Sequence, residues 1–163
     1  LAGIDLSKEA VKKAAKRCRA SELAVASLYR LPLADSSVDM IVNCFSPLAE
    51  REFFRAIKSG GKFIYVVPGP KHLWEMKEIL YSSPYMNMER REDYPGFLWE
   101  KMIPVETEFM LETNQDIMDL YQMTPYAWKT PREGVERLCS AERLTVTAQF
   151  HVHVYSAEKA GNE

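Results

Sequence analysis

The sequence predicts an α/β fold in which helices cover both faces of a mainly parallel sheet. Two patterns in the first half of the chain support this class. Strand-like apolar segments alternate with segments of helical period, an order typical of parallel strands linked by helical crossovers. The run Met40 to Val42 is continuously apolar, as expected of a strand that is covered on both faces. The chain has 163 residues, 47% of them hydrophobic, which is enough for one domain with a sizeable core.

The first half of the chain yields the elements of this fold in order. Gly3 to Leu6 closes a strand, and Ser7 can cap the amphipathic helix that follows it. Two further strands are expected at Glu22 to Ser27 and at Ser37 to Phe45. A short helix over Arg51 to Lys58 is expected to end at Gly60 and Gly61, before a strand over Lys62 to Pro68.

The second half is less regular. We expect helices at Lys71 to Tyr81, Asn114 to Tyr121 and Pro131 to Cys139, a strand at Val105 to Glu112, and a long strand at Leu144 to Tyr155. The last strand alternates polar and apolar residues, which favours a place near a sheet edge. Residues 85–100 mix aromatics, prolines and charges without a period, which predicts an irregular excursion or a lid. The carboxyl-terminal boundary of the domain is expected at residue 155, and a frayed tail is expected over 156–163.

Composition excludes some classes of protein. There are 21 basic and 23 acidic residues, a net charge of -2, so the overall charge does not indicate a nucleic-acid binder. The three cysteines are odd in number and far apart, which suits a reducing cytoplasm. No apolar run is long enough to cross a membrane. His151 and His153 share a strand face without a third ligand in view, so we expect no metal site.

Ligands of open parallel sheets bind at the carboxyl ends of the strands. The residues there are Asp5, the turn Ala26 to Leu28, the loop Asn43 to Pro47, and Pro68 to His72. Asp5 ends the first expected strand, where an acidic side chain can accept the two hydroxyls of a ribose. The alternative is an acid that only complements a helix N-terminus.

Several segments of the sequence resemble motifs of known protein families. "RLPLADSSVDMIV" (30–42) and "EFFRAIKSGGKFIYVVP" (52–68) resemble class I S-adenosylmethionine-dependent methyltransferases, although Ser59 stands where that family usually has proline. "VPGPKHLWEMK" (67–77) and "LYQMTPYAWKT" (120–130) are similar to the RlmA family of large-subunit ribosomal RNA guanine-N1-methyltransferases, some of which confer macrolide resistance. The resemblance runs from Gly3 to about Tyr155.

The resemblance implies a Rossmann-like methyltransferase sheet, S-adenosylmethionine as the cofactor and a ribosomal RNA hairpin as the partner. By the same resemblance, Asp5 takes the ribose hydroxyls and Leu6 packs on the adenine. Ala26 and Ser27 lie at the adenine edge, and His72 lies near the cofactor.

Substrate contacts are expected in two places. Asn43 and Pro47 follow the third strand, and Tyr126 and Trp128 belong to an aromatic cluster on which an unpaired base could stack; a packed core is the alternative for that cluster. The sequence does not identify the base that removes the guanine N1 proton. His72 and an acid of the 43–50 loop are the candidates. Phosphate contacts could come from basic residues that otherwise form a solvated surface: Lys71, Lys77, Arg90, Arg91, Lys101, Lys129 and Arg132.

Two parts of the resembling family have no counterpart in the sequence. They are an amino-terminal zinc module and the glycine-rich cofactor loop after the first strand. We therefore expect the chain to be the carboxyl-terminal part of a longer enzyme, impaired by itself, with zinc only in the absent module. We also expect exposed strand edges that could pair with another chain or in a homodimer. The alternatives are a small-molecule methyltransferase of the same fold and a noncatalytic fragment that acts as an interaction module.

Overall fold

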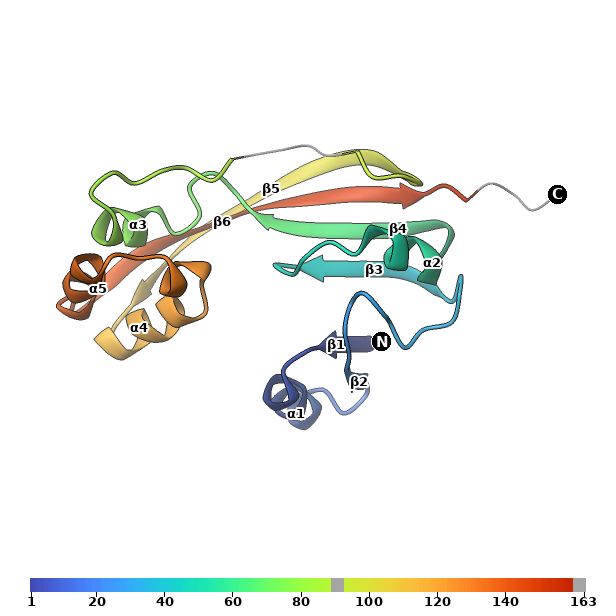
Figure 1. Cartoon of the computed structure of the whole chain (residues 1–163), viewed down its shortest axis with the longest axis horizontal. Helices are drawn as coiled ribbons and strands as arrows, with labels where there is room; N and C mark the ends of the chain where they lie inside the picture. Colours follow the sequence, from blue (N-terminus) through green and yellow to red (C-terminus); the bar gives the residue numbers. More distant parts are fainter. Residues whose placement is uncertain (89–92, 160–163) are drawn as a thin grey trace. The chain divides into compact units, whose positions relative to one another are not determined.

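The computed structural model describes residues 1–88 and 93–159 of the chain (Figure 1). It divides into two compact units. Unit 1 comprises Leu1–Tyr65, Asp93–Lys101 and Val154–Glu163, and unit 2 comprises Val66–Glu92 and Met102–His153. Three long strands contribute residues to both units: β4 (Ile57–Pro68), β5 (Phe97–Leu111) and β6 (Leu144–Ala157).

Unit 1 begins with a parallel pair of strands. β1 (Ala2–Asp5) pairs with β2 (Glu22–Val25), and the register sets Asp5 opposite Val25. The helix between them, α1 (Lys8–Arg17), starts where the sequence predicts, because the Ser7 hydroxyl accepts a hydrogen bond from the Ala10 amide (3.2 Å). The predicted strand–helix–strand order of this segment is confirmed.

A second sheet has the strand order β3-β4-β6-β5, with β3 spanning Val38–Cys44. The arrowheads of β3 and β4 point the same way, and β6 runs in the opposite direction (Figure 1). Residues 144–155 are expected near a sheet edge, and β6 lies second from the edge, between β4 and the outer strand β5. Some of its polar residues are buried and paired: Thr147 is 9% exposed and donates to Glu75. β5 stands last in the order, where Pro104 is tolerated because an outer strand can lack one backbone donor.

Among the described residues, β1 pairs only with β2, and β3 pairs only with β4 within its sheet. This matches the free strand edges that the sequence predicts at this point. Pairing of either edge with another chain stays a prediction.

The segment after β3 differs from its predicted boundaries. Helix α2 spans Glu50–Ala56, and β4 begins directly at Ile57, so the predicted helix end at Lys58 is wrong. Gly60 and Gly61 lie inside β4 instead of closing the helix. Gly60 has a φ of 72°, and a Cβ on Gly61 would lie 2.9 Å from the Asp39 carbonyl oxygen of β3. The glycine pair therefore permits the close approach of two strands.

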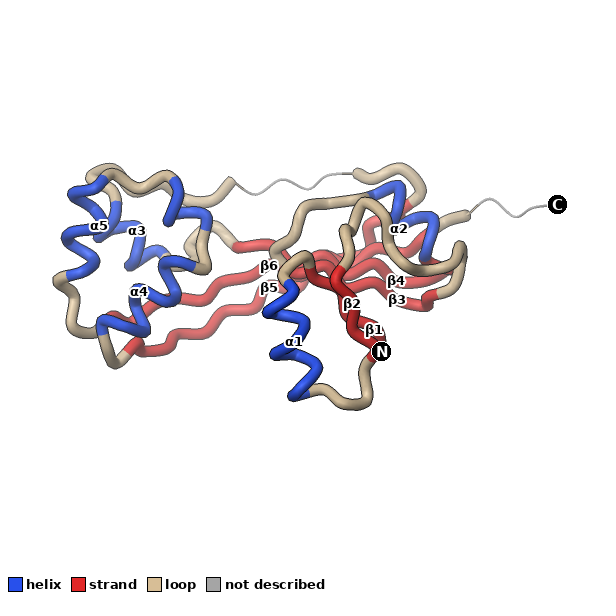
Figure 2. The backbone as a smooth tube through the Cα atoms, turned by 60° about the horizontal axis from the view of Figure 1, so that its bottom comes forward, coloured by secondary structure: helices blue, strands red, loops and turns tan. Residues whose placement is uncertain are grey.

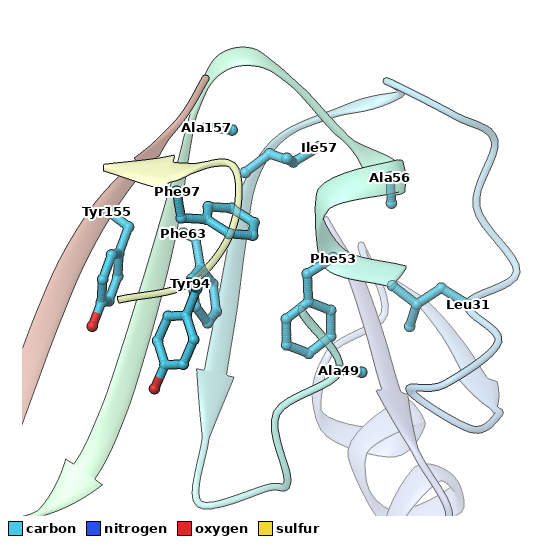
Figure 3. Close-up of a cluster of buried hydrophobic side chains, with 10 residues drawn as sticks. All are labelled: Leu31, Ala49, Phe53, Ala56, Ile57, Phe63, Tyr94, Phe97, Tyr155 and Ala157. Carbon is cyan, nitrogen blue, oxygen red and sulfur yellow. The ribbon is translucent and has the colours of Figure 1, made fainter. Parts of the chain in front are cut away.

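Aromatic rings form the core of unit 1 (Figure 3). Phe63 of β4 is fully buried at its centre, with ring centroids 5.5 Å from Phe53, 5.2 Å from Phe97 and 5.6 Å from Tyr155. These separations are typical of favourable ring pairs. The core therefore joins α2, β4, β5 and β6 within this unit. Its buried residues are Leu31, Ala49, Phe53, Ala56, Ile57, Phe63, Tyr94, Phe97, Tyr155 and Ala157.

The Glu52–Arg55 pair of the resemblance motif clamps the loop before β3. Arg55 donates to the carbonyls of Leu33 (2.8 Å) and Leu31 (3.3 Å), and Glu52 accepts from the Leu31 amide (2.7 Å) and from Arg55 (2.7 Å). The hydrogen bond from Arg55 holds the pKa of Glu52 below its usual value, against the opposing effect of burial. The motif has a structural role.

The clamp predicts a pH effect. Because the folded pKa of Glu52 is lowered from 4.5, its stabilising contribution is present above pH 4.5 and is lost as the pH falls through the folded pKa. We expect Glu52→Gln to lower the free energy of unfolding at pH 7 and to cost progressively less as the pH falls below 4.5. Urea unfolding at several pH values measures this difference. A cost that is constant from pH 7 to pH 3 would show that the carboxylate charge is not involved.

Unit 2 contains a group of short helices: α3 (Trp74–Leu80), α4 (Asn114–Gln122) and α5 (Arg132–Cys139), which Figure 2 shows together, and the 3-10 helix η1 (Pro125–Trp128). The predicted helix at 71–81 is shorter than expected, because Leu73 adopts a left-handed conformation (φ 54°) that delays the start to Trp74. The buried residues of this core are Leu73, Met76, Leu80, Ile117, Tyr121, Leu138 and Val146.

The irregular segment ends earlier, and the tail begins later, than the sequence predicts. Tyr94 bridges to Phe97, where β5 begins, and β6 extends to Ala157. Glu158 still donates a backbone hydrogen bond to Gly96 (2.8 Å). Residues 89–92, including the predicted phosphate contacts Arg90 and Arg91, and residues 160–163 of the predicted frayed tail lie outside the described residues. Within the described ranges, no helix is both long and apolar enough to span a membrane.

Candidate functional site

Four predicted cofactor residues converge at the carboxyl ends of β1 and β2. The Ala26 amide donates to the Asp5 carbonyl (3.2 Å), which continues the parallel pairing by one residue and brings the two strand ends together. Leu6 and Ser27 follow directly on the two strands. The convergence results from the parallel register, which sets both carboxyl ends at one edge of the sheet.

The side chains at this edge suit a nucleoside. Asp5 is exposed, and one of its carboxylate oxygens accepts from the Ser7 amide (2.6 Å), which fixes the carboxylate while its other oxygen faces no described donor. Leu6 is 71% exposed, an apolar surface next to the acid. The Ser27 hydroxyl accepts from the Tyr29 amide (3.3 Å), so it is also held in place. A fixed carboxylate acceptor and an exposed apolar side chain are therefore adjacent.

A hollow beside Asp5 is smaller than the cofactor requires. It measures about 220 Å³ and is lined by Gly3, Ile4, Asp5, Ala10, Val11, Ala14 and Leu23. Sites that enclose small molecules usually measure about 300 to 1,000 Å³. This hollow is therefore too small to enclose S-adenosylmethionine, and the residues at the strand ends form an open surface.

Asn43 and Pro47 lie together in the loop after β3. Asn43 is 4% exposed, and its amide nitrogen donates to the carbonyls of Pro47 (3.2 Å) and Ser46 (3.4 Å). Its amide oxygen accepts from the Ser46 hydroxyl. These bonds use the Asn43 side chain to shape the loop. A substrate role for Asn43 and Pro47 stays a prediction.

His72 lies in the turn after β4, in unit 2. Its amide donates to the Gly69 carbonyl (3.1 Å), and its ring packs 4.7 Å from the ring of Phe150. Burial lowers the pKa of His72 from 6.5, the positive charge of Lys77 lowers it further, and a hydrogen bond with the Gln149 backbone opposes them. The lowered pKa favours the neutral imidazole.

Tyr126 and Trp128 lie in η1 of the same unit. The Tyr126 ring packs edge-on against Tyr81 (centroids 6.3 Å apart), and burial raises its pKa to about 12. Trp128 is 89% exposed. The core alternative for this cluster thus holds for Tyr121, which is 5% exposed, but not for Trp128. Contact of Tyr126 and Trp128 with a base stays a prediction.

Lys77 is the residue of this region that the sequence misplaces. The sequence assigns it to a basic surface, but its side chain is fully buried (0% exposed). Its ammonium donates to Asn87 Oδ1 (2.7 Å) and to the Tyr85 carbonyl (3.0 Å). It also lies over the rings of Tyr85 and Tyr126, 4.9 and 5.5 Å from their centroids. The signal in the sequence is its position on α3, one residue after Met76 and three before Leu80, on the helix face that is buried.

Comparisons with solved structures identify the fold. The chain is similar to the YcgJ protein of Bacillus subtilis with a TM-score of 0.59 at 14% identity, covering 98% of this chain and 82% of that one. It is also similar to a geranyl diphosphate C-methyltransferase of Streptomyces coelicolor, with a TM-score of 0.52 at 13% identity, covering 96% of this chain and 62% of that one. A sequence model described as a methyltransferase domain matches residues 1–65. The architecture is that of the class I S-adenosylmethionine-dependent methyltransferases, as the sequence predicts.

Sequence relatives define the family more closely. One is a Bacillus subtilis protein that carries the provisional name 23S rRNA (guanine-N(1)-)-methyltransferase YxjB; it is 32% identical over 155 residues, covering 92% of this chain and 55% of the relative. Another, the 23S rRNA (guanine(748)-N(1))-methyltransferase of Streptomyces fradiae, is 36% identical over 102 residues, covering 62% of this chain and 35% of the relative. The chain spans about half the length of the curated relatives it matches. Its sequence is thus similar to parts of proteins that are named, in two cases provisionally, 23S ribosomal RNA guanine-N1-methyltransferases.

Proposed function

We propose that this chain supplies cofactor- and guanine-binding residues of an enzyme that methylates N1 of a guanine in large-subunit ribosomal RNA. The observation that carries the proposal is the convergence of Asp5, Leu6, Ala26 and Ser27 at one edge of a class I methyltransferase sheet. The names of the relatives support the ribosomal RNA substrate.

The residues present fit one side of S-adenosylmethionine. The Asp5 carboxylate, held by the Ser7 amide, accepts hydrogen bonds from the ribose hydroxyls. The exposed Leu6 side chain would pack on the adenine, and the Ala26–Ser27 backbone would lie at its edge. When bound, the cofactor supplies a methyl group already activated by a sulfonium. The chain therefore has mainly to orient the donor and the acceptor.

The acceptor needs a base as well as orientation, because guanine N1 carries a proton. We assign its removal to His72, whose lowered pKa favours the neutral, proton-accepting imidazole. His72 would accept the N1 proton, and the bound cofactor would supply the methyl group for the electron pair left on N1, its sulfur keeping the electrons of the broken bond.

Aromatic side chains of η1 are proposed to hold the guanine. Trp128 exposes its ring, and Tyr126 offers a ring that is fixed by Tyr81. Bases taken out of an RNA stack bind between such rings. Basic residues described as exposed, Lys71, Lys101, Lys129 and Arg132, are proposed to contact phosphates.

Transfer of a labelled methyl group tests the proposal. The protein from the complete reading frame is incubated with methyl-labelled S-adenosylmethionine and either deproteinised 23S ribosomal RNA or a small-metabolite extract. We expect label in the RNA and not in the extract. Label in a small molecule alone would make the protein a small-molecule methyltransferase, and no cofactor binding by the complete protein would make it a noncatalytic interaction module; either result contradicts the proposal.

A further inference from the structure

Lys77 joins three segments of unit 2 through a line of hydrogen bonds. Its ammonium donates to Asn87 Oδ1 (2.7 Å), and the Asn87 side-chain amide donates to the Gly69 carbonyl (2.8 Å). The same carbonyl accepts from the His72 amide (3.1 Å). The Asn87 side chain and the Gly69 carbonyl thus connect the buried ammonium on α3 to the turn that carries His72.

The contacts of Lys77 also include an aromatic ring of the proposed guanine site. The ammonium lies 5.5 Å from the centroid of the Tyr126 ring, close enough for a cation–π interaction. The Thr130 hydroxyl donates to the Tyr126 carbonyl (2.8 Å) and lies 3.3 Å from the Tyr81 hydroxyl, and the Tyr81 ring packs edge-on against the Tyr126 ring. The side chain of Lys77 therefore contacts the element that carries Tyr126 while it restrains the turn that carries His72.

A buried lysine is costly unless its charge is used. Both hydrogen-bond acceptors of the ammonium are neutral groups, a carbonyl and an amide, so they offset only part of the desolvation of the charge. Leucine or methionine would satisfy the burial at this position of α3 without that cost. The position therefore indicates a requirement beyond packing.

We propose that Lys77 is a positioning residue of the proposed guanine site in unit 2: through Asn87 it fixes the turn that carries His72, and through its charge it fixes the ring of Tyr126. This inference rests on the proposed function, because it assigns the two positioned groups to the proton acceptor and to the guanine contact. The positive charge also disfavours a proton on His72, so the imidazole stays free to receive the proton of N1.

Other titratable groups lie on the elements around His72. Glu75 on α3 accepts from Thr147, and Glu106 on β5 accepts from Gln149, so each carboxylate is paired with a side chain of β6. Lys71 precedes His72 in the same turn and is exposed, and His151 lies on β6. The charge that shifts the pKa of His72 is that of Lys77 rather than that of one of these groups.

The test compares Lys77→Met with Arg137→Met in the intact protein. Methionine keeps the length of the lysine side chain and removes its charge. Arg137 is the matched control, because it also donates to backbone at the end of α3, at Ile79 (2.9 Å) and Leu80 (3.4 Å), but does not belong to the line of contacts from Lys77 to His72. NMR titration of the histidine ring protons, assigned with His72→Gln, gives the pKa of His72 in each variant.

We expect Lys77→Met to raise the pKa of His72, to lower kcat by about 10- to 100-fold, and to move the low-pH limb of kcat to higher pH. Arg137→Met is expected to lower stability and to leave the pKa of His72 unchanged. An unchanged pKa of His72 in folded Lys77→Met would overturn the proposal. The NMR result does not depend on RNA methylation, so a protein that fails to methylate RNA refutes the proposed function separately.

A second measurement decides the case if Lys77→Met does not fold. In the unsubstituted protein, the Cε resonance of Lys77 reports its protonation. Burial lowers the pKa of Lys77 from 10.5, and the proposal requires this pKa to stay above that of His72. A lysine that loses its proton before His72 does, as the pH rises, would overturn the electrostatic role.

Discussion

Replacing Asp5 with alanine is expected to weaken the binding of S-adenosylmethionine by about 10- to 100-fold. Hydrogen bonds to a charged group contribute about 1.5 to 3 kcal/mol, and each 1.4 kcal/mol corresponds to tenfold in affinity. Asp5→Asn is the sharper variant, because its amide oxygen can still accept from the Ser7 amide and keep the start of α1 intact. Calorimetric titration of the intact protein with the cofactor or its demethylated product measures the change.

Glu9→Gln is the matched control for Asp5. Glu9 is an acid in the first turn of α1, where its exposed carboxylate pairs with Lys12 (3.0 Å). We expect it to leave cofactor affinity unchanged. Equal losses for Asp5→Asn and Glu9→Gln would assign Asp5 to helix capping alone, the alternative that the sequence leaves open.

Replacing Gly134 with alanine is expected to lower the free energy of unfolding by about 3 kcal/mol. An added Cβ would lie 2.1 Å from the carbonyl oxygen of Leu80 and 2.9 Å from its carbonyl carbon. These are backbone atoms of α3, so no side chain can turn aside, and α5 must move away from a packed core. The midpoint of thermal unfolding should fall by about 6 to 12 °C for a protein of this size.

Glu133→Ala is the control for Gly134, because it changes the exposed preceding residue of α5 and should alter stability by less than about 0.5 kcal/mol. Urea unfolding gives both values. A tolerated Gly134→Ala would mean that α3 and α5 do not approach one another as closely as described.

Local signals in the sequence predict much of the fold. The cap at Ser7, the parallel strands on either side of α1 and the helix at Asn114 depend on neighbouring residues and are confirmed. The alternation of β6 predicts a strand near the sheet edge, and β6 lies next to the outer strand. The burial of Thr147 was not predictable from this alternation, because a buried threonine that is paired by α3 gives the same pattern as a solvated one.

The candidate site was predictable to the extent that it follows strand ends. Asp5 and Ala26 meet because parallel strands end at one edge, and this needs only the order of the elements. Lys77 was missed because a lysine in an amphipathic helix is normally counted with the polar face. The ammonium contacts Asn87 and Tyr126, which both lie outside α3 in the sequence. Only the folded chain brings these residues to it, so helical spacing could not reveal the contacts.

The position of the new methyl group tests the central proposal most directly. Ribosomal RNA treated with the intact protein and S-adenosylmethionine is digested to nucleosides and separated by liquid chromatography with mass detection, alongside RNA treated with Asp5→Asn. We predict 1-methylguanosine with the unsubstituted protein, much less of it with the variant, and a matching stop in reverse transcription because a methyl group on N1 blocks base pairing. A methyl group on an exocyclic amine, on another base or on the ribose would contradict the proposed function.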